Sequence, residues 1–242
     1  MTAAEIKFVK SLSQKKFRDA SGLFVVEGEK LVAEALASRF TLEKVYRREE
    51  IGEAAMARIS ALSSPSPALA LVRRPGDLLR DEVPAKGLIL ALDGIRDPGN
   101  LGTILRIADW FGIDAVFASP DTVDVFNPKV VQATMGAIFR VRFHYTEIPA
   151  FCHRALAAGG KVYGTFLDGE NLYRKALDNG SEAPSVIVIG NEANGISAAT
   201  ASRVSERLYI PPFPADDPGS ESLNAAVATA VTVAEFRRQG SL

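Results

Sequence analysis

The sequence predicts an α/β protein built around a parallel, doubly wound sheet, with a smaller α/β region before it. Short and mostly apolar runs recur along the chain, as expected of strands buried on both faces. Segments with apolar residues spaced near 3.6 lie between those runs and predict helices. Near residues 74–86 the stretch RRPGDLLRDEVPAKG carries two prolines, two glycines and mixed charge. We therefore expect one domain over residues 1–80 and a second over residues 86–242.

The first region alternates between strand-like and helix-like segments. In chain order these are the strand LFVVEG from Leu23, the helix EKLVAEALAS, the strand LEKVYRR, the helix EIGEAAMARISAL and the strand ALALV. Such alternation predicts helices packed on a small sheet.

The second region alternates more regularly. The expected strands are GLILAL, DAVFAS, KVYGTFL, SVIVIG and a short LYI. The expected helices between and after them are NLGTILRIADWFG, NPKVVQATMGAIFR, AFCHRALAAGG and SLNAAVATAVTVAEFRR. The last helix has small residues on most of its first two turns, which permits close approach of a backbone, a ligand or a partner subunit. A doubly wound sheet of this kind binds its ligand at the carboxyl ends of the strands.

Composition limits the classes of function. A chain of 242 residues with 47% hydrophobic residues can bury a sizeable core, and a net charge of −1 gives no global signature of nucleic-acid binding. Cys152 is the only cysteine, so a disulfide within the chain and a cysteine-rich zinc site are excluded and a reducing compartment is expected. Neither a signal-peptide core nor an apolar run of the ~20 residues that span a bilayer is present. We expect a soluble, cytoplasmic protein.

The first candidate motif follows the strand GLILAL. Asn100, Gly102 and Arg106 form the pattern N-x-G-x-x-x-R at a strand-to-helix junction. In one interpretation Asn100 caps the helix, Gly102 allows tight packing and Arg106 is solvated. In the other, the helix N-terminus and Arg106 bind a phosphate.

Two further motifs stand at strand ends. In SVIVIGNEANGIS, Gly190 either serves the loop conformation or lets a ligand approach the backbone, and Glu192 is either merely exposed or accepts hydrogen bonds from an arginine or a ribose. In RLYIPPFPADDPGSESLNAAVATAV, the residues Glu221-Ser222-Leu223-Asn224 open the final helix. A Ser or Glu capping arrangement on an ordinary C-terminal helix would account for them.

Together and in this order, the three motifs resemble those of the SpoU (TrmH-like) family of RNA 2′-O-ribose methyltransferases, which belongs to the SPOUT class. The resemblance covers residues 87–242 and rests on DPGNLG, IGNEANGIS and IP followed by ESLNAAVA. The segment KFVKSLSQKKFRDASGLFVVEGEKLVAEAL is similar to the small ribosomal-protein-like RNA-binding domain that precedes the catalytic domain in many members.

The resemblance implies the chemistry of the site. Arg106 matches the family's proposed general base for the ribose 2′-hydroxyl. The polar positions that orient Arg106 and the ribose match Asn100, Glu192, Ser222 and Asn224. Positioning of the hydroxyl is expected to matter as much as the proton transfer, and no metal is required.

The resemblance also implies a C-terminal trefoil knot that binds S-adenosylmethionine, and a homodimer formed through the knot and the C-terminal helix. The positions that match the cofactor site are Gly190, Ile210 and Leu223. The loop 211–220 is longer than is common in the family and acidic at Asp216 and Asp217. This departure from the family pattern would change the cofactor affinity and the shape of the RNA groove.

The substrate is expected to be ribosomal or transfer RNA, bound in part by the N-terminal region. Five basic residues with no acid among them form a candidate phosphate-binding patch: Lys7, Lys10, Lys15, Lys16 and Arg18. A solvated basic face is the alternative.

Three rival functions share parts of this pattern. The first is a knotted RNA-binding protein without methylation activity, which would need neither Arg106 nor Asn224. The second is a SPOUT enzyme that methylates a base nitrogen. The third is a nucleotide-dependent metabolic enzyme, although the chain has no G-x-G-x-x-G fingerprint.

Overall fold

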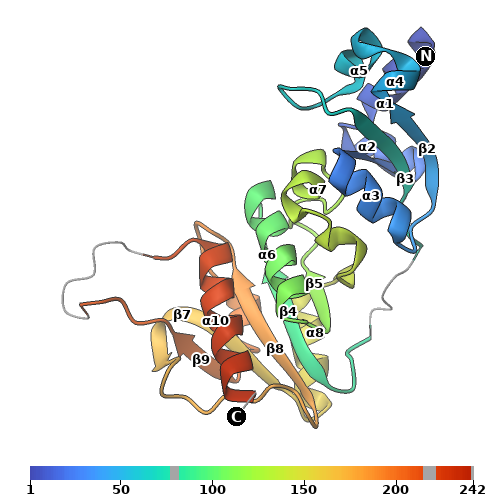
Figure 1. Ribbon diagram of the computed structural model, residues 1–242. Coiled ribbons are helices and arrows are strands. Elements are labelled where there is room, and N and C mark those ends of the chain that lie inside the picture. Colours follow the sequence, from blue (N-terminus) through green and yellow to red (C-terminus); the bar gives the residue numbers. More distant parts are fainter. Residues whose placement is uncertain (77–81, 215–221, 241–242) are drawn as a thin grey trace. The chain divides into compact units, whose positions relative to one another are not determined.

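The computed structural model describes residues 1–76, 82–214 and 222–240. The chain divides into two compact units, and most of their helices and strands are labelled in Figure 1. Unit 1 comprises residues 1–77 and 124–140, and unit 2 comprises residues 78–123 and 141–242. This division differs from the linear one expected from the sequence, because residues 124–140 pack with the N-terminal region.

Unit 1 contains a three-stranded antiparallel sheet in the order β1-β3-β2. Its strands are β1 (Leu23–Glu27), β2 (Leu42–Arg47) and β3 (Ala68–Arg73). Its helices are α1 (Ala3–Ser11), α2 (Lys15–Ser21), α3 (Glu29–Ala37), α4 (Arg48–Ile51), α5 (Glu53–Ile59), α7 (Pro128–Thr134) and the 3₁₀ helix η1 (Ala137–Phe139). The three expected strands and α3 are confirmed, whereas α1 and α2 were not predicted. The helix expected over EIGEAAMARISAL is split into α4 and α5 at Gly52, whose φ of +83° interrupts a helix.

The sheet of unit 1 is covered on both faces. Side chains of α1 and α5 pack with one face in a cluster that includes Ile6, Val9, Met56, Leu69 and Leu71. Phe24, which lies between two residues of β1 that point the other way, joins an aromatic cluster on the opposite face with Phe40, Phe126 and Phe139. Residues 124–140 thus supply part of the core of unit 1.

A buried ion pair also holds residues 124–140 in unit 1. The Arg18 side chain is 2% exposed and its guanidinium lies 2.5 Å from a carboxylate oxygen of Asp124, which is 9% exposed. The same guanidinium donates hydrogen bonds to the carbonyl oxygens of Leu12 at 2.8 Å and Ser13 at 2.9 Å. All three guanidinium nitrogens of Arg18 therefore donate hydrogen bonds, as burial of a charge requires.

The single helix expected over NPKVVQATMGAIFR is wrong in one respect. The Asn127 side chain caps α7 by accepting a hydrogen bond from the Lys129 N–H at 2.9 Å. The helix ends at Thr134 because Met135 and Gly136 adopt left-handed conformations, with φ of 50° and 96°. A short 3₁₀ turn, η1, follows.

Unit 2 is a six-stranded parallel sheet in the order β6-β5-β4-β8-β7-β9. Its strands are β4 (Gly87–Asp93), β5 (Ala115–Ala118), β6 (Phe143–Tyr145), β7 (Lys161–Asn171), β8 (Pro184–Gly190) and β9 (Glu206–Tyr209). Its helices are α6 (Pro98–Trp110), α8 (Ile148–Ala157), α9 (Ala198–Ala201) and α10 (Ala225–Gly240). The parallel sheet and its helices confirm the expected fold class, and β6 and α9 are additions. The trefoil knot stays a prediction.

Helices lie on both faces of this sheet. The side chains of Phe151, Cys152 and Ala155 on α8 pack with Ile89 and Val186 in one core cluster. On the other face α10 lies beside α6 (Figure 1). Burial, reinforced by the charge of Asp93, raises the pKa of the Cys152 thiol to about 12, so this cysteine is a protonated core residue.

None of the helices among the described residues combines the length and the apolar character that crossing a membrane requires. The cytoplasmic location expected from the sequence stays a prediction.

Candidate active site

The candidate site lies where the strand order of unit 2 changes direction. From β4 the chain first builds β5 and β6 on one side, and then β7, β8 and β9 on the other. Strands β4 and β8 are therefore neighbours, and Asp93 is paired to Gly190 at their carboxyl ends. A crevice at such a point is the usual ligand site of a doubly wound sheet.

Asn191 ties the two loops together. Its side-chain Nδ2 donates to the carbonyl oxygen of Gly94 at 2.6 Å, while its Oδ1 accepts from the N–H groups of Ala193 at 2.9 Å and Asn194 at 3.1 Å. Asn191 was not among the site residues predicted from the sequence. The signal was present, since Asn before a turn that ends in glycine favours this side-chain-to-backbone pattern.

The structure explains the glycine at position 190 by the fold of the loop, and not by the close approach of a ligand. A Cβ atom at this position would lie 2.3 Å from the carbonyl carbon of Gly195 and 2.3 Å from the nitrogen of Ile196. The loop after β8 folds back directly over the strand end. The chain's own backbone therefore requires a glycine here, whatever ligand binds.

Asn100 stands at the centre of the site, but it is not the helix cap. Asp97 caps α6 by accepting a hydrogen bond from the Asn100 N–H at 2.8 Å, and Pro98 occupies the first turn. The Asn100 side chain, 9% exposed, is thus free for tertiary contacts. Its Nδ2 donates to Glu192 Oε1 at 2.8 Å, and its Oδ1 accepts from Asn224 Nδ2 at 2.9 Å.

Asn224 completes the chain of hydrogen bonds. Its Oδ1 accepts from the N–H groups of Ala226 at 2.9 Å and Val227 at 3.3 Å, so Asn224, and not Ser222, caps α10, while Glu221 lies outside the described residues. Glu192, Asn100 and Asn224 are thereby linked, although one residue comes from each of the three sequence motifs. The side-chain amides of Asn100 and Asn224 have fixed orientations, because the nitrogen of each one donates a hydrogen bond and its oxygen accepts one.

Arg106 and Ser222 stand apart from this chain. Arg106 is exposed on α6, six residues beyond Asn100. Six helical residues turn through 600°, which places the two side chains about 120° apart and about 9 Å along the axis. Within the described part of the chain, neither Arg106 nor the exposed Ser222 makes a hydrogen bond or ion pair. An exposed guanidinium at a helix surface can bind an incoming phosphate.

The residues expected to bind S-adenosylmethionine surround the same strand ends. Gly190 ends β8, Ile210 follows β9 and is half-buried, and Leu223 precedes Asn224 and is 50% exposed. Main-chain groups at strand ends and uncovered apolar side chains fit a ligand with a polar ribose and an apolar purine face. Asp216 and Asp217, the two residues that make the loop 211–220 acidic, lie outside the described residues.

The structure corrects the expected basic patch in unit 1. Lys7, Lys10, Lys15 and Lys16 are exposed, and Lys15 lies 2.7 Å from the Asp19 carboxylate. Arg18 is not on this surface, because its guanidinium is buried against Asp124. Over the ranges that the structure describes, no group of three or more His, Cys, Asp or Glu residues could hold a metal ion.

Comparison with known proteins accounts for both units. Residues 87–234 match the SpoU rRNA methylase family, and residues 3–64 match an MRM3-like substrate-binding domain. The chain is 31% identical over 248 residues to the 23S rRNA (guanosine(2553)-2′-O)-methyltransferase RlmP of Bacillus subtilis, with 96% of each chain covered. It is 34% identical over 164 residues to the 23S rRNA (guanosine-2′-O-)-methyltransferase RlmB of Coxiella burnetii, covering 67% of this chain and 62% of that protein.

A solved structure gives the same result. The AdoMet-bound rRNA methyltransferase from Sinorhizobium meliloti is 30% identical and superposes with a TM-score of 0.86, covering 98% of this chain and 95% of that one. The two units, the three motifs joined at the strand ends and these matches agree. The chain belongs to the SpoU rRNA methylase family and is an S-adenosylmethionine-dependent RNA ribose 2′-O-methyltransferase.

Proposed function

We propose that this enzyme methylates the ribose of a nucleotide in ribosomal RNA, using Arg106 and the hydrogen-bonded chain Glu192–Asn100–Asn224. That chain is the observation that carries the proposal, because it joins the three motifs in one polar site. Ribosomal RNA is favoured over transfer RNA because RlmP, which is matched over 96% of both chains, is named for a 23S rRNA nucleotide.

The residues of this chain divide the work as follows. S-adenosylmethionine supplies an electrophilic methyl group, and Gly190, Ile210 and Leu223 lie where its main-chain and apolar contacts would form. The ribose 2′-oxygen is a poor nucleophile until its proton leaves. Glu192, held by Asn100, orients the hydroxyl by accepting its hydrogen bond. Arg106 contacts the adjoining phosphate and, as the general base, accepts the proton that the hydroxyl loses. Ser222 completes the polar surface beside Leu223.

The test is methyl transfer from tritiated S-adenosylmethionine to RNA from cells that lack the protein. Ribosomal and transfer RNA are assayed separately, digested to nucleosides and analysed. Label in a 2′-O-methyl nucleoside of ribosomal RNA alone is expected. Label in transfer RNA, or in a base-methylated nucleoside, would contradict the proposal.

We also place RNA binding in residues 1–80 and catalysis in residues 86–242. The two matched ranges, 3–64 and 87–234, support this assignment. Residues 124–140 are counted with the RNA-binding part, since they share its core and its buried ion pair.

Replacing both Lys15 and Lys16 with alanine is expected to weaken RNA binding and to lower its salt dependence. Each phosphate that the protein neutralises contributes roughly 0.7–0.9 to the slope of log K against log salt, so the slope should fall by about 1.4–1.8 if each lysine contacts one phosphate. Binding titrations over a range of KCl concentrations measure this slope. S-adenosylmethionine affinity should not change, and an unchanged slope would remove the two lysines from the interface.

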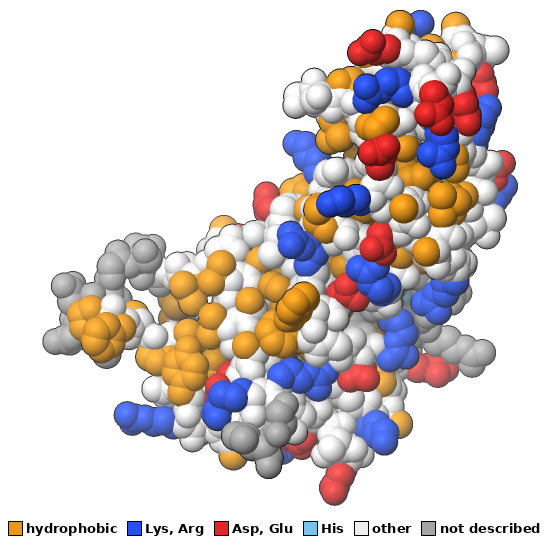
Figure 2. Space-filling view, viewed as in Figure 1, with side chains coloured by type: hydrophobic (Ala, Val, Ile, Leu, Met, Phe, Trp, Pro, Cys, Tyr) orange, Lys and Arg blue, Asp and Glu red, His pale blue; other side chains and the backbone are white. Residues whose placement is uncertain are grey.

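A homodimer formed through α10, and through the predicted knot, is also part of the proposal. Hydrophobic side chains gather over α10 and the neighbouring end of α6 (Figure 2). Among them Trp110 is 85% exposed and Val227 is 49% exposed. Large apolar side chains left uncovered on neighbouring helices are typical of a protein interface.

Substituting Val227→Glu is expected to convert the dimer to a monomer, because the interface would bury an unpaired charge. Sedimentation equilibrium should give twice the chain mass of 25.9 kDa for the wild type and the chain mass for the variant. The substitution Ala157→Glu, at an exposed position at the end of α8 on the other face of the sheet, is a control for added negative charge. A monomeric wild type would contradict the dimer.

A further inference from the structure

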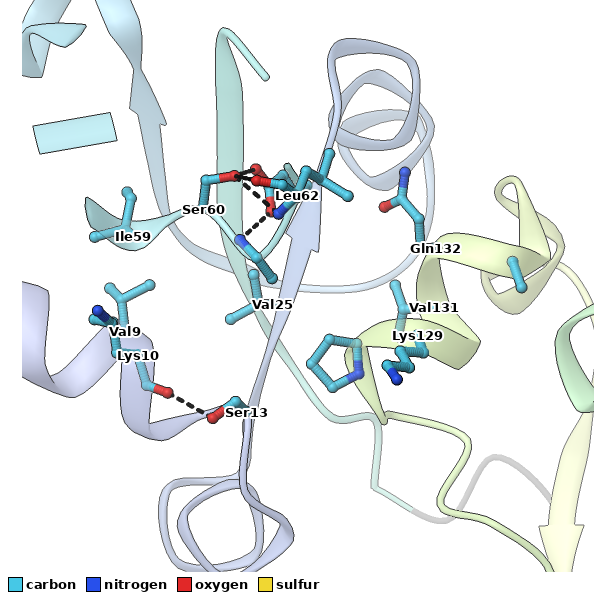
Figure 3. A pocket seen from close by; sticks show the side chains of 14 residues that line it. Val9, Lys10, Ser13, Val25, Ile59, Ser60, Leu62, Lys129, Val131 and Gln132 are labelled. Carbon is cyan, nitrogen blue, oxygen red and sulfur yellow. Dashed lines mark hydrogen bonds between the residues drawn. The ribbon is translucent and has the colours of Figure 1, made fainter. Parts of the chain in front are cut away.

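Unit 1 contains a cavity that the catalytic function does not use. Its volume is about 550 Å³, and it is lined by α1, β1, residues 59–62 and α7. Figure 3 shows the side chains of α1 on one side of this space and those of α7 on the other. All of these elements belong to unit 1.

The walls of the cavity are apolar. Val9, Val25, Ile59, Pro128 and Val131 all face it. The space is open to solvent on one side, so a ligand can enter it from outside. The volume lies within the range of roughly 300–1,000 Å³ that is typical of small-molecule sites.

Two ammonium groups stand at the cavity from different elements. Lys10 comes from α1 and Lys129 from α7, and both side chains are exposed. Across the residues that the structure describes, neither lysine has an ion-pair partner, whereas nearby Lys15 and Lys44 are paired with Asp19 and Glu5. Two unpaired cations beside one apolar chamber favour a ligand with an apolar body and an anionic group.

The cavity also has a polar wall. The carboxyl group of Glu27, 5% exposed, accepts hydrogen bonds from the Ser60 hydroxyl and, at 2.9 Å, from the Ala61 N–H. Each carboxyl oxygen can accept more than one hydrogen bond, so acceptor capacity remains on the side that faces the cavity. The exocyclic amino groups of adenine, cytosine and guanine are matched donors, and uracil has none.

We propose that this cavity binds one unpaired nucleotide of the substrate RNA. The base enters between the apolar walls toward Glu27, and the phosphates on its two sides are held by Lys10 and Lys129, which come from opposite sides of the cavity. The inference rests on the proposed function and deepens it, since it makes unit 1 a reader of a single-stranded nucleotide and not only a basic surface. Specific RNA recognition commonly takes this form, with an unstacked base in a protein pocket.

The first experiment uses the full chain with ¹³C-labelled Ile, Leu and Val methyl groups. The 5′-monophosphates of adenosine, guanosine, cytidine and uridine are titrated separately, and the methyl resonances of Val9, Val25, Ile59 and Val131 are followed. These resonances should shift, with uridine monophosphate binding most weakly. No shift of the cavity methyl groups with any of the four nucleotides would overturn the inference.

Lysine variants test the phosphate contacts. The double substitution Lys10→Ala/Lys129→Ala should weaken the binding of a short single-stranded RNA on the order of tenfold and lower its salt slope by about 1.4, at roughly 0.7 for each contact. Lys30→Ala, at an exposed lysine on α3 away from the cavity, is the matched control and should have no effect. Equal losses in both variants would contradict a site at the cavity.

A third variant separates this inference from the proposed function. Ala133→Phe, on α7, places a ring in the volume that the base would occupy and should therefore raise KM for ribosomal RNA roughly tenfold while leaving kcat unchanged. An unchanged melting temperature verifies that the variant folds. If wild type methylates ribosomal RNA and the cavity methyl groups stay silent, the cavity inference fails alone. If nucleotides shift those methyl groups and ribosomal RNA is not methylated, the proposed function fails alone.

Discussion

Replacing Arg106 with alanine should lower kcat for methyl transfer by about 10²–10⁴-fold, the range typical of a lost proton-transfer group. The fold should survive, because Arg106 is exposed and makes no contact with the described side chains that its removal would leave unpaired. S-adenosylmethionine binding, measured by calorimetry, should be unchanged. Single-turnover methylation of ribosomal RNA at saturating cofactor gives the rate.

Two further variants assign the cause of the loss. Arg106→Lys keeps the positive charge and removes the planar fork. Recovery of most of the rate in this variant would mean that charge on the phosphate is sufficient, whereas no recovery would mean that the guanidinium geometry is required. Thr103→Ala, at an exposed position on the same helix, is the control and should retain the wild-type rate. A wild-type rate for Arg106→Ala would exclude the residue from catalysis.

Buried parallel strands were the most predictable part of the fold. Strands such as β4 and β8 are covered on both faces, so they read as uninterrupted apolar runs bounded by glycine. The strand β6 has three residues, all half-buried, and leaves no such run. The single helix expected over residues 127–140 fails at Met135, because nothing in that residue type signals a left-handed conformation.

The residues of the site were predictable, but their arrangement was not. Asn100, Glu192 and Asn224 were recognised individually from their motifs. Their hydrogen bonds join residues 92 and 124 positions apart, which only the strand order brings together. Of the two interpretations of Asn100, the helix cap is wrong, and the sequence argued against it, since Asp97 followed by Pro98 is the stronger start signal for a helix.

Arg18 shows the limit of reading charge from sequence. It stands among lysines that are exposed, and a charged residue type is seldom fully buried. Its partner Asp124 lies 106 residues further along the chain, so no local pattern announces the pair. The same long-range contact explains why residues 124–140 belong to unit 1, a division that no composition change marks.

Breaking that pair should have the largest effect on stability. Asp124→Ala would leave the Arg18 guanidinium, 2% exposed, without its carboxylate, and the free energy of unfolding should fall by about 3–5 kcal/mol. Urea unfolding followed by circular dichroism measures the loss. Lys15→Ala removes a solvent-exposed ion pair in the same unit and should change the free energy by less than about 1 kcal/mol.

A double variant shows whether the stability lost in Asp124→Ala comes from the uncompensated charge of Arg18 or from a loss of packing. The double variant Arg18→Met/Asp124→Leu has no buried charge, so it should recover most of the stability lost in Asp124→Ala. If the double variant is as unstable as the single one, the hydrogen bonds from Arg18 to the carbonyl oxygens of Leu12 and Ser13 are the main contribution. Because the cofactor residues lie in unit 2, S-adenosylmethionine affinity should remain while RNA affinity falls with Asp124→Ala. An equal loss of both would mean that the pair stabilises the whole chain and not unit 1.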